Sequence, residues 1–268
     1  MSGSTITSIN VCKVYGGESP LTALDGISLD IEPGEFISIL GPSGSGKSTF
    51  LHCIAGLEDI SSGSLKADGR EISGPPDHSG MVFQRDALLD WRTIERNIML
   101  PIEFAKKPVA QYKQTMRDLL KLVGLSDFGS KYPRELSGGM RQRAAICRAL
   151  IDQPSLLLMD EPFGALDALT RDQMNVELQR IWLETLNTVV FVTHGIAEAV
   201  FLADRVVVFT PRPGRIADII EIDLPRPRKL AVRETPEFGK YTNHIRALFH
   251  EMGLINEEIE HVNKAVLS

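Results

Sequence analysis

The stretch GPSGSGKS at residues 41–48 constrains the fold of this chain more than any other part of its sequence. It matches the pattern G-x-x-x-x-G-K-[ST], follows the continuous apolar run 36–40, and precedes a helix that we predict to begin near Lys47. In this pattern, glycines let backbone N–H groups point at phosphate oxygens, the lysine reaches the β- and γ-phosphates, and the Ser48 hydroxyl is available to Mg²⁺. The stretch therefore predicts a buried strand, a phosphate-binding loop and a helix in succession. A chance match within a Gly/Ser turn is the alternative.

Composition narrows the class of protein. The chain has 268 residues, 43 % hydrophobic and 24 % charged, which is typical of a globular protein rather than a disordered or collagen-like one. Its net charge of −6 disfavours nucleic-acid binding, which depends on excess Lys and Arg. Cys12, Cys53 and Cys147 are far apart and form no C-x-x-C pair, so no disulfide framework or zinc site is predicted. Without a signal sequence or an apolar run of about 18 residues, we expect a cytoplasmic protein that reaches a membrane only through a partner.

Hydrophobic periodicity predicts an α/β protein. Alternating Ile27, Leu29 and Ile31 predict a strand, and Asp68-Gly69 predicts a tight hairpin turn. Residues from about 93 to 150 have helical spacing, whereas the apolar runs 156–159, 189–193 and 206–209 alternate with helix-length segments, which is typical of βαβ units. We therefore predict a nucleotide-binding α/β core with a helical insertion. Residues 211–229 are expected to form an extended edge or connector, and a further helix is expected beyond 236, with one apolar stripe formed by Ile255, Ile259, Val262 and Val266.

Two acidic residues follow the apolar run LLLM at 156–159. Because Asp160 comes at the carboxyl end of a predicted strand, we expect it beside the phosphate loop, where it would hold Mg²⁺ directly or through water. Glu161 is then positioned to polarise the attacking water, which requires a carboxylate within hydrogen-bond reach. A solvated acidic residue at a strand end is the alternative for Glu161.

The stretch LSGGM at 136–140 opens a second glycine-rich helix that no strand precedes. Ser137 is a good N-cap for the helix that continues to Leu150, and capping contributes about 1 kcal/mol. Two glycines at a helix start cost about 1 kcal/mol each relative to alanine if they lie inside the helix. Close approach of a phosphate to Gly138 and Gly139 explains them better than stability does.

The order of the phosphate loop, LSGGM followed by RQRAAICRAL, and LLLMDEP resembles the nucleotide-binding subunit of an ATP-binding cassette (ABC) transporter from about residue 5 to 215. The resemblance implies the ABC ATPase fold, a P-loop NTPase core of mostly parallel sheet with an antiparallel β subdomain and a helical insertion at about 90–152. It also implies an ATPase that forms a head-to-tail homodimer, in which each ATP lies between the phosphate loop of one subunit and the LSGG helix of the other. The ATPase domain is then expected over 1–230, with a helical C-terminal extension over 231–268.

Site residues can be carried over from the family position by position. Tyr15 resembles the aromatic residue that stacks on adenine, although an ordinary strand aromatic is the alternative. Gln84 resembles the glutamine that senses Mg²⁺ and water, and His194 the switch histidine at the γ-phosphate; a loop glutamine and a satisfied polar histidine are the alternatives. Asp167 resembles the aspartate that communicates across the dimer. The catalytic set is Glu161, His194 and Gln84; the Mg²⁺ set is Ser48, Gln84 and Asp160; the ATP-binding set is Tyr15, Gly41, Ser43, Gly44, Gly46, Lys47, Ser48, Thr49, Ser137, Gly138 and Gly139.

This sequence departs from the commoner family pattern at Gly164, where Ser is frequent, and at Gly195, where Asp is frequent. Neither change removes a catalytic side chain, so hydrolysis is expected to survive. The glycine at 164 does, however, put in doubt the coupling between the two subunits of the dimer at this position.

Segments such as LLDWRTIERNI and FLADRVVVFTPRPGRI resemble the nitrate, sulfonate and taurine importer branch. This implies a peripheral subunit on the cytoplasmic face of the bacterial inner membrane, working with a permease and, indirectly, with a solute-binding protein. Apolar Leu88, Leu89 and Trp91 would form the groove for a permease helix, or pack inside the helical subdomain. A soluble ABC ATPase and an exporter subunit are the alternatives. Four basic residues are expected to form a solvated face, with lipid contact as the other option: Arg226, Arg228, Lys229 and Arg233.

Overall fold

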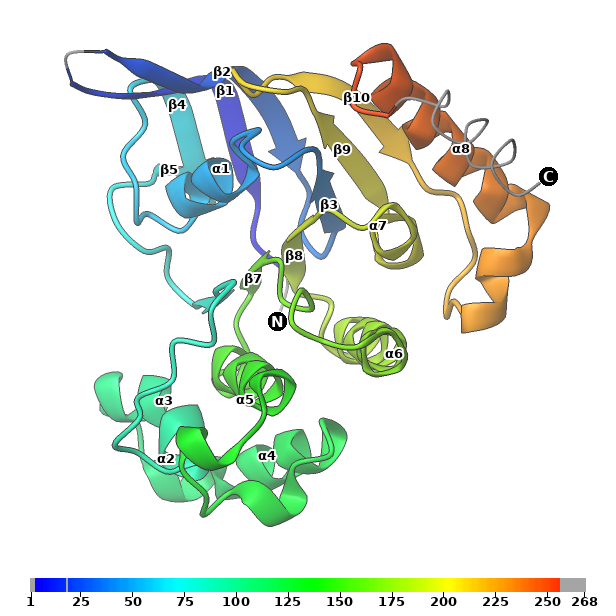
Figure 1. Cartoon of the computed structure of the whole chain (residues 1–268). Coiled ribbons are helices and arrows are strands. Elements are labelled where there is room, and N and C mark those ends of the chain that lie inside the picture. The colour runs from blue at the N-terminus through cyan, green and yellow to red at the C-terminus, as the bar shows by residue number, and fades with distance from the viewer. Residues whose placement is uncertain (1–2, 18, 256–268) are drawn as a thin grey trace.

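The main sheet of the computed structural model, which describes residues 3–17 and 19–255, has six strands in the order β10-β9-β3-β8-β7-β6 (Figure 1). These strands are β3 Phe36–Leu40, β6 Ser79–Val82, β7 Leu156–Asp160, β8 Thr188–Thr193, β9 Arg205–Phe209 and β10 Ile216–Glu221. Neighbouring strands are parallel, except that β10 is antiparallel to β9. Strands β3, β7 and β8 are buried along their whole length, as the continuous apolar runs predict for strands covered on both faces.

The second sheet is antiparallel, with the order β2-β1-β4-β5. Its strands are β1 Ile6–Tyr15, β2 Leu21–Ile31, β4 Ser62–Ala67 and β5 Arg70–Glu71. The predicted alternation is confirmed in β2, where Ile27, Leu29 and Ile31 are buried and the residues between them are exposed. The predicted turn at Asp68-Gly69 joins β4 to β5, and both residues have positive φ, 49° and 74°, as a type I′ hairpin turn requires.

Helices cover the main sheet and fill the region that was predicted to be helical. They are α1 Lys47–Ile54, α2 Ile94–Ile98, α3 Leu100–Phe104, α4 Val109–Leu122, α5 Gly138–Leu150, α6 Ala168–Thr185, α7 Ile196–Leu202 and α8 Pro236–Glu251. Short 3₁₀ helices lie at η1 Ser126–Phe128, η2 Pro133–Glu135 and η3 Leu230–Glu234. Among the described residues, no helix is both long and apolar enough to cross a bilayer.

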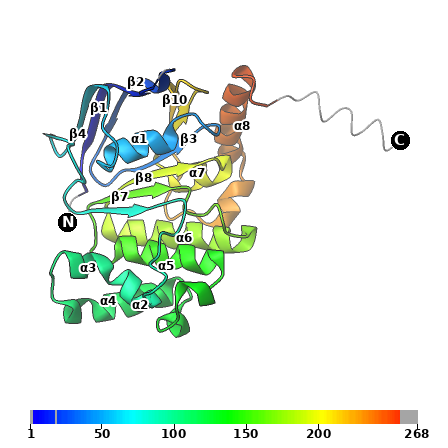
Figure 2. The same ribbon diagram turned by 60° about the vertical axis from the view of Figure 1, so that its left-hand side comes forward.

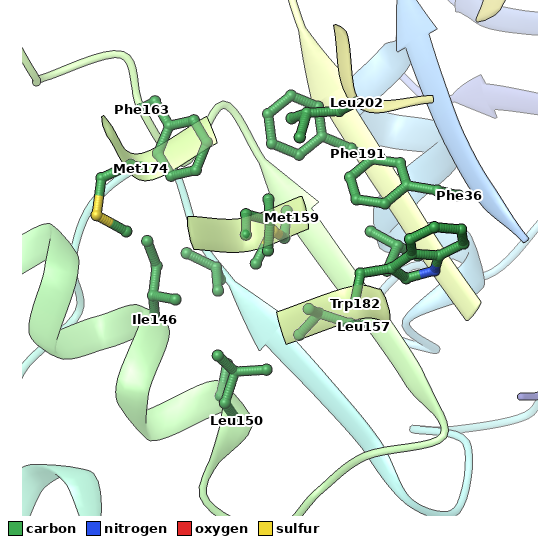
Figure 3. Packing of buried hydrophobic residues seen from close by; sticks show 14 of the residues in the cluster. Phe36, Ile146, Leu150, Leu157, Met159, Phe163, Met174, Trp182, Phe191 and Leu202 are labelled. Carbon is green, nitrogen blue, oxygen red and sulfur yellow. The ribbon is translucent and has the colours of Figure 1, made fainter. Parts of the chain in front are cut away.

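The two faces of the main sheet belong to two apolar cores. Helix α1 lies between the two sheets (Figure 2), and its Phe50 packs in one core with Ile37 and Ile39 of β3. Helices α5 and α6 lie on the opposite face, where Ile146 and Trp182 pack in the second core (Figure 3). This arrangement leaves the carboxyl ends of β3, β7 and β8 at one edge, where loops can collect polar side chains.

The segment 211–229 corrects one prediction made from the sequence. It contains the edge strand β10, as expected, but the basic residues predicted at its end and just after it do not form a solvated face or a lipid-contacting one. Arg228 is 3 % exposed and donates hydrogen bonds to five backbone carbonyls, including those of Val200 and Ala203, and burial lowers its pKa to about 10. Arg226 pairs with Asp204 and Arg233 is half-buried, so of the four residues predicted to form the face only Lys229 is largely exposed. The carbonyls satisfy a buried guanidinium that sequence alone cannot distinguish from a surface one.

The C-terminal helix α8 ends at Glu251. Arg233, in η3 just before it, pairs with Asp172 of α6. Of the stripe predicted beyond 236, Ile255 follows the end of α8, and Ile259, Val262 and Val266 lie outside the described residues. The proposed boundary at about 230 between an ATPase domain and a C-terminal extension stays a prediction.

Candidate functional site

The loop 41–48 joins β3 to α1, so the chain turns from a buried strand directly into a helix. Gly44 and Gly46 have φ values of 75° and 90°, which L side chains rarely adopt, and a Cβ at Gly46 would lie 2.7 Å from the Ala23 carbonyl oxygen. Ser43 and Gly44 are exposed on the loop, while Ser48 and Thr49 are half-buried in the first turn of α1. The backbone conformation of the loop therefore requires glycine at 44 and 46. The outer side of the loop, at Ser43 and Gly44, remains open to solvent.

Lys47 is buried beneath this loop. Its Nζ donates to the carbonyl oxygens of Gly41 and Pro42, at 2.9 Å and 2.8 Å. Burial lowers the pKa of the Lys47 ammonium, and the carboxylates of Glu161 and Asp160 oppose that effect. In this structure the ammonium is held by carbonyl oxygens at the site where phosphate oxygens are predicted to bind.

Asp160, at the end of β7, reaches the start of α1. Its Oδ1 accepts a 2.8 Å hydrogen bond from Ser48 Oγ, and its Oδ2 lies 3.8 Å from His52 Nε2. Burial raises the pKa of the Asp160 carboxyl, while the Ser48 hydrogen bond acts in the opposite direction. The described residues contain no group of three or more His, Cys, Asp or Glu side chains suited to a metal ion. A hydroxyl and a carboxylate as a pair do fit Mg²⁺, which takes most of its ligands from phosphates and water.

Three predicted catalytic residues meet at the carboxyl edge of the sheet. Glu161 Oε2 lies 3.3 Å from Gln84 Nε2 and 3.3 Å from His194 Nδ1, and these residues follow β7, β6 and β8 respectively. Glu161 has φ 44°, an uncommon value for a residue other than glycine, and its N–H donates to the Val192 carbonyl oxygen at 2.9 Å. The side chains of neighbouring strand ends thus converge on one carboxylate, beside Asp160 and the phosphate loop.

Beneath His194 lies a network that the sequence analysis did not find. Thr193 Oγ1 donates to Glu198 Oε2 and accepts a 3.0 Å hydrogen bond from the N–H of Gly195, so it fixes the backbone on both sides of the histidine. Burial raises the pKa of the Glu198 carboxyl, and the Thr193 hydrogen bond opposes this. The available sequence signal was an acidic residue in the first turn of α7, which ordinarily indicates only a favourable helix-dipole interaction.

We expect Glu198→Ala to lower kcat for ATP hydrolysis about tenfold with little change in KM, because losing one hydrogen bond of about 1.4 kcal/mol frees the histidine loop without touching the phosphate loop. Glu198→Gln should retain most of the activity, since its amide oxygen can accept the Thr193 hydrogen bond. Steady-state kinetics on wild type, Glu198→Ala and Glu198→Gln test this. An equal decrease in kcat in both variants would contradict a positioning role for Glu198.

The predicted second half of the ATP site lies elsewhere in the chain. Ser137 caps α5 by accepting from the Met140 N–H at 3.3 Å, and Ser137 and Gly138 are exposed. Helix α5 packs on the sheet face opposite α1 (Figure 2). No hydrogen bond or ion pair of the described residues joins 137–139 to the phosphate loop. Within one chain the two predicted ATP-binding motifs therefore remain separate.

Tyr15 and Asp167 occupy simpler surroundings. Tyr15 ends β1, is half-buried, and has the Lys13 Nζ 4.9 Å from its ring centroid. Asp167 caps α6 by accepting from Thr170 N and Oγ1, which lowers the pKa of its carboxyl. At Gly164 an added Cβ would make only ordinary contact, 3.4 Å from the Glu161 carbonyl oxygen, so nothing steric requires glycine there.

The apolar residues after Gln84 were expected either to form an exposed groove or to pack inside the helical subdomain, and the structure shows some of each. Leu88 is buried in the core and Leu89 is half-buried, whereas Trp91 is 75 % exposed. Phe104 of α3, which the sequence analysis did not single out, is 77 % exposed. It lines a cavity of about 310 Å³ together with Met81, Phe83, Ala87, Leu100 and Arg148. The region thus offers an open apolar groove, formed by a somewhat different set of side chains.

Several known proteins are similar to this chain over most of its length. A family model described as ABC transporter matches residues 24–164. A putative ATP-binding protein of Brucella abortus (strain 2308) is 43 % identical over 94 % of this chain and 96 % of its own. The taurine import ATP-binding protein of Rhizobium johnstonii is 45 % identical, over 85 % of this chain and 89 % of its own. A nitrate import ATP-binding protein of Synechocystis sp. is 42 % identical, over 95 % of this chain and 97 % of its own.

Solved structures give the same picture of the fold. A dimeric ATP-binding cassette in a post-hydrolysis state, bound to ADP and Pi, aligns with a TM-score of 0.73 and 32 % identity, covering 82 % of this chain and all of that one. A second dimeric structure, described as a bacterial ABC transporter cassette, aligns with a TM-score of 0.74 and 33 % identity.

Proposed function

Because this chain belongs to the ABC transporter family and is an ATP-binding cassette with ATPase activity, we propose that it drives import of a small anion through a separate membrane permease. Nitrate, a sulfonate and taurine are the proposed solutes. Support comes from relatives at 42 % and 45 % identity that are named as nitrate and taurine import proteins. The subunit would lie on the cytoplasmic face of the bacterial inner membrane, and a solute-binding protein would deliver solute to the permease.

The observation that carries this proposal is the connection between the apolar groove and the catalytic edge. Gln84 contacts Glu161 and lies in the chain between Phe83 and Ala87, which both line the groove. That segment is tied to α5: Arg141 Nε pairs with Asp86 Oδ2 at 2.8 Å, and Arg148 donates to the carbonyl oxygens of Asp86 and Ala87. A helix seated in the groove would therefore act on both Gln84 and the Ser137 end of α5.

The proposed hydrolytic cycle uses a homodimer. Ser137, Gly138 and Gly139 of a second copy would cover ATP bound at the phosphate loop, with Tyr15 against adenine and Asp167 facing the partner. Ser137 is exposed and makes no hydrogen bond to the phosphate loop of its own chain, which favours this arrangement. Binding of ATP would close the dimer, and hydrolysis would reopen it.

Within each site we assign roles by position. Lys47 would leave the Gly41 and Pro42 carbonyls to bind phosphate oxygens. Ser48, Asp160 and Gln84 would hold Mg²⁺, which supplies positive charge to the triphosphate. Glu161 would accept a proton from the attacking water, and His194, 3.3 Å from it, would contact the γ-phosphate.

The groove gives the experiment that tests the proposal. We expect Phe104→Asp to abolish recovery of a multi-spanning permease when the tagged chain is purified from native membranes with ATP, because a charge cannot be desolvated in an apolar contact. Ile219→Asp, at a partly exposed apolar position on the far edge strand β10, is the matched control and should retain the permease. Thermal unfolding of each variant checks its fold.

One outcome would contradict the transporter proposal, and another would contradict only the docking site. One is recovery of ribosomes, DNA or no membrane protein by the wild-type chain, which would favour a soluble ABC ATPase. The other is equal recovery of a permease by Phe104→Asp and wild type, which would exclude this groove as the docking site. Reconstitution of the recovered complex with nitrate or taurine on one side distinguishes import from export.

A further inference from the structure

The segment that connects β9 to β10, residues 210–215, packs directly against the phosphate loop although it is about 170 residues away in sequence. The Gly214 N–H donates to the Ala23 carbonyl oxygen at 2.9 Å, and the Asp25 N–H donates to the Gly214 carbonyl oxygen at 2.9 Å. A Cβ at Gly214 would lie 2.1 Å from the carbonyl oxygen of Ser45. Backbone approach this close requires glycine, so the position of the segment against the loop is fixed by its own main chain.

This packing brings Arg212 to the open side of the phosphate loop. Its Nε lies 3.4 Å from the carbonyl oxygen of Gly44, a long hydrogen bond, and its NH2 would lie 3.2 Å from a Cβ at Gly44. In the described part of the chain, no carboxylate pairs with Arg212, which is exposed. Arg215, three residues later, makes a two-nitrogen contact with Asp25 Oδ2 instead. One arginine of the segment is thus neutralised, and the other remains available beside the loop.

The charge at this position complements a triphosphate. Lys47 is buried beneath the loop, whereas Arg212 stands on its solvent side, next to the exposed Ser43 and Gly44. A guanidinium forms stronger, more directional hydrogen bonds with phosphate oxygens than with a neutral carbonyl. Exchange of the 3.4 Å contact with the Gly44 carbonyl oxygen for a contact with a phosphate oxygen is therefore favourable.

We propose that Arg212 is a nucleotide-binding residue whose guanidinium contacts the polyphosphate of ATP from the solvent side of the phosphate loop. The proposal rests on ATP binding by that loop and not on import. It adds a contact from outside the motifs that were predicted to bind ATP, contributed by the β9–β10 connection.

The test is the affinity of the purified full chain for ATP, measured by isothermal titration calorimetry at low ionic strength. We expect Arg212→Gln to raise the Kd for ATP about tenfold, the effect of one charge-assisted hydrogen bond. The difference from wild type should shrink in 0.5 M salt, which screens an exposed charge. Arg212→Lys should recover part of the affinity, since it keeps the charge but not the fork of donors.

Arg215→Gln is the matched control, with the same loss of charge three residues away on the same segment. We expect its Kd for ATP to stay within about twofold of wild type, because Arg215 is committed to Asp25 in an exposed ion pair. Equal increases in Kd for both variants would overturn the proposal, since they would indicate a general effect of the segment. An unchanged Kd in Arg212→Gln would also overturn it.

A further variant separates this inference from the assignment of the loop itself. Lys47→Ala should weaken ATP binding strongly if the loop 41–48 binds the phosphates. Wild-type affinity in Lys47→Ala would refute that assignment, whereas wild-type affinity in Arg212→Gln alone would refute only the role of Arg212. Thermal unfolding without nucleotide shows whether each variant retains its fold.

Discussion

Glu161→Gln should reduce ATP turnover about a thousandfold while ATP binding stays intact. The amide has nearly the shape of the carboxylate but cannot accept a proton from water, and general-base catalysis contributes about 10²–10⁴-fold. Glu161 Oε2 lies 3.3 Å from both Gln84 Nε2 and His194 Nδ1, so the substitution removes the carboxylate on which the other two predicted catalytic residues converge. Release of phosphate measures turnover, and equilibrium binding of ATP measures affinity.

The same variant should accumulate as a closed dimer in the presence of ATP, because the step that reopens the dimer no longer occurs. Size-exclusion chromatography with and without ATP detects this. Glu177→Gln, on the surface of α6 where the carboxylate pairs with Arg180, is the matched control and should behave like wild type. Wild-type turnover in Glu161→Gln would refute the role that we assign to this carboxylate.

Ser137→Arg should abolish hydrolysis and ATP-dependent dimer formation, although each chain still binds ATP. Ser137 is exposed at the start of α5 and does not contact the phosphate loop of its own chain. A long cationic side chain at this position would obstruct the surface that is proposed to cover the partner's ATP. Turnover, dimer formation and the Kd for ATP, measured on one preparation, separate closure from binding.

Loss of the helix cap alone must be distinguished from obstruction of the dimer. Ser137→Arg removes a capping hydrogen bond, which costs about 1 kcal/mol. Thr93→Arg removes the corresponding N-cap of α2 and adds the same charge in the neighbouring helix. Wild-type turnover is expected for Thr93→Arg. Normal hydrolysis in Ser137→Arg would rule out the ATP sandwich.

Much of the fold followed from local patterns. Continuous apolar runs identified β3, β7 and β8, because a strand covered on both faces has no polar side. Alternation identified β2, and Asp68-Gly69 identified the turn between β4 and β5. These predictions are confirmed because a strand's hydrophobic pattern and a turn's conformation are determined by a few consecutive residues.

Arginine burial did not follow from sequence. Arg228 belongs to a run that has the composition of a solvated basic face, but the carbonyls that satisfy its guanidinium come mostly from the end of α7, about 25 residues earlier. The sequence analysis missed Glu198 for a similar reason. Its hydrogen bond with Thr193 matters because that residue holds the backbone around His194, which only the structure shows. The environment of a polar side chain is set by what packs against it, which periodicity does not describe.

The sequence by itself determined the chemistry that this protein can perform: a phosphate loop between a strand and a helix, two carboxylates at a strand end, and a glycine-rich helix start. These are local features, fixed by backbone conformation and by which side chains adjoin a strand end. Only the tertiary structure decided which of them meet. It brought Gln84 and His194 to Glu161, kept Ser137 apart from the phosphate loop, and placed Arg212 on that loop. Such contacts depend on strand order and on packing between distant segments, and no local pattern encodes either.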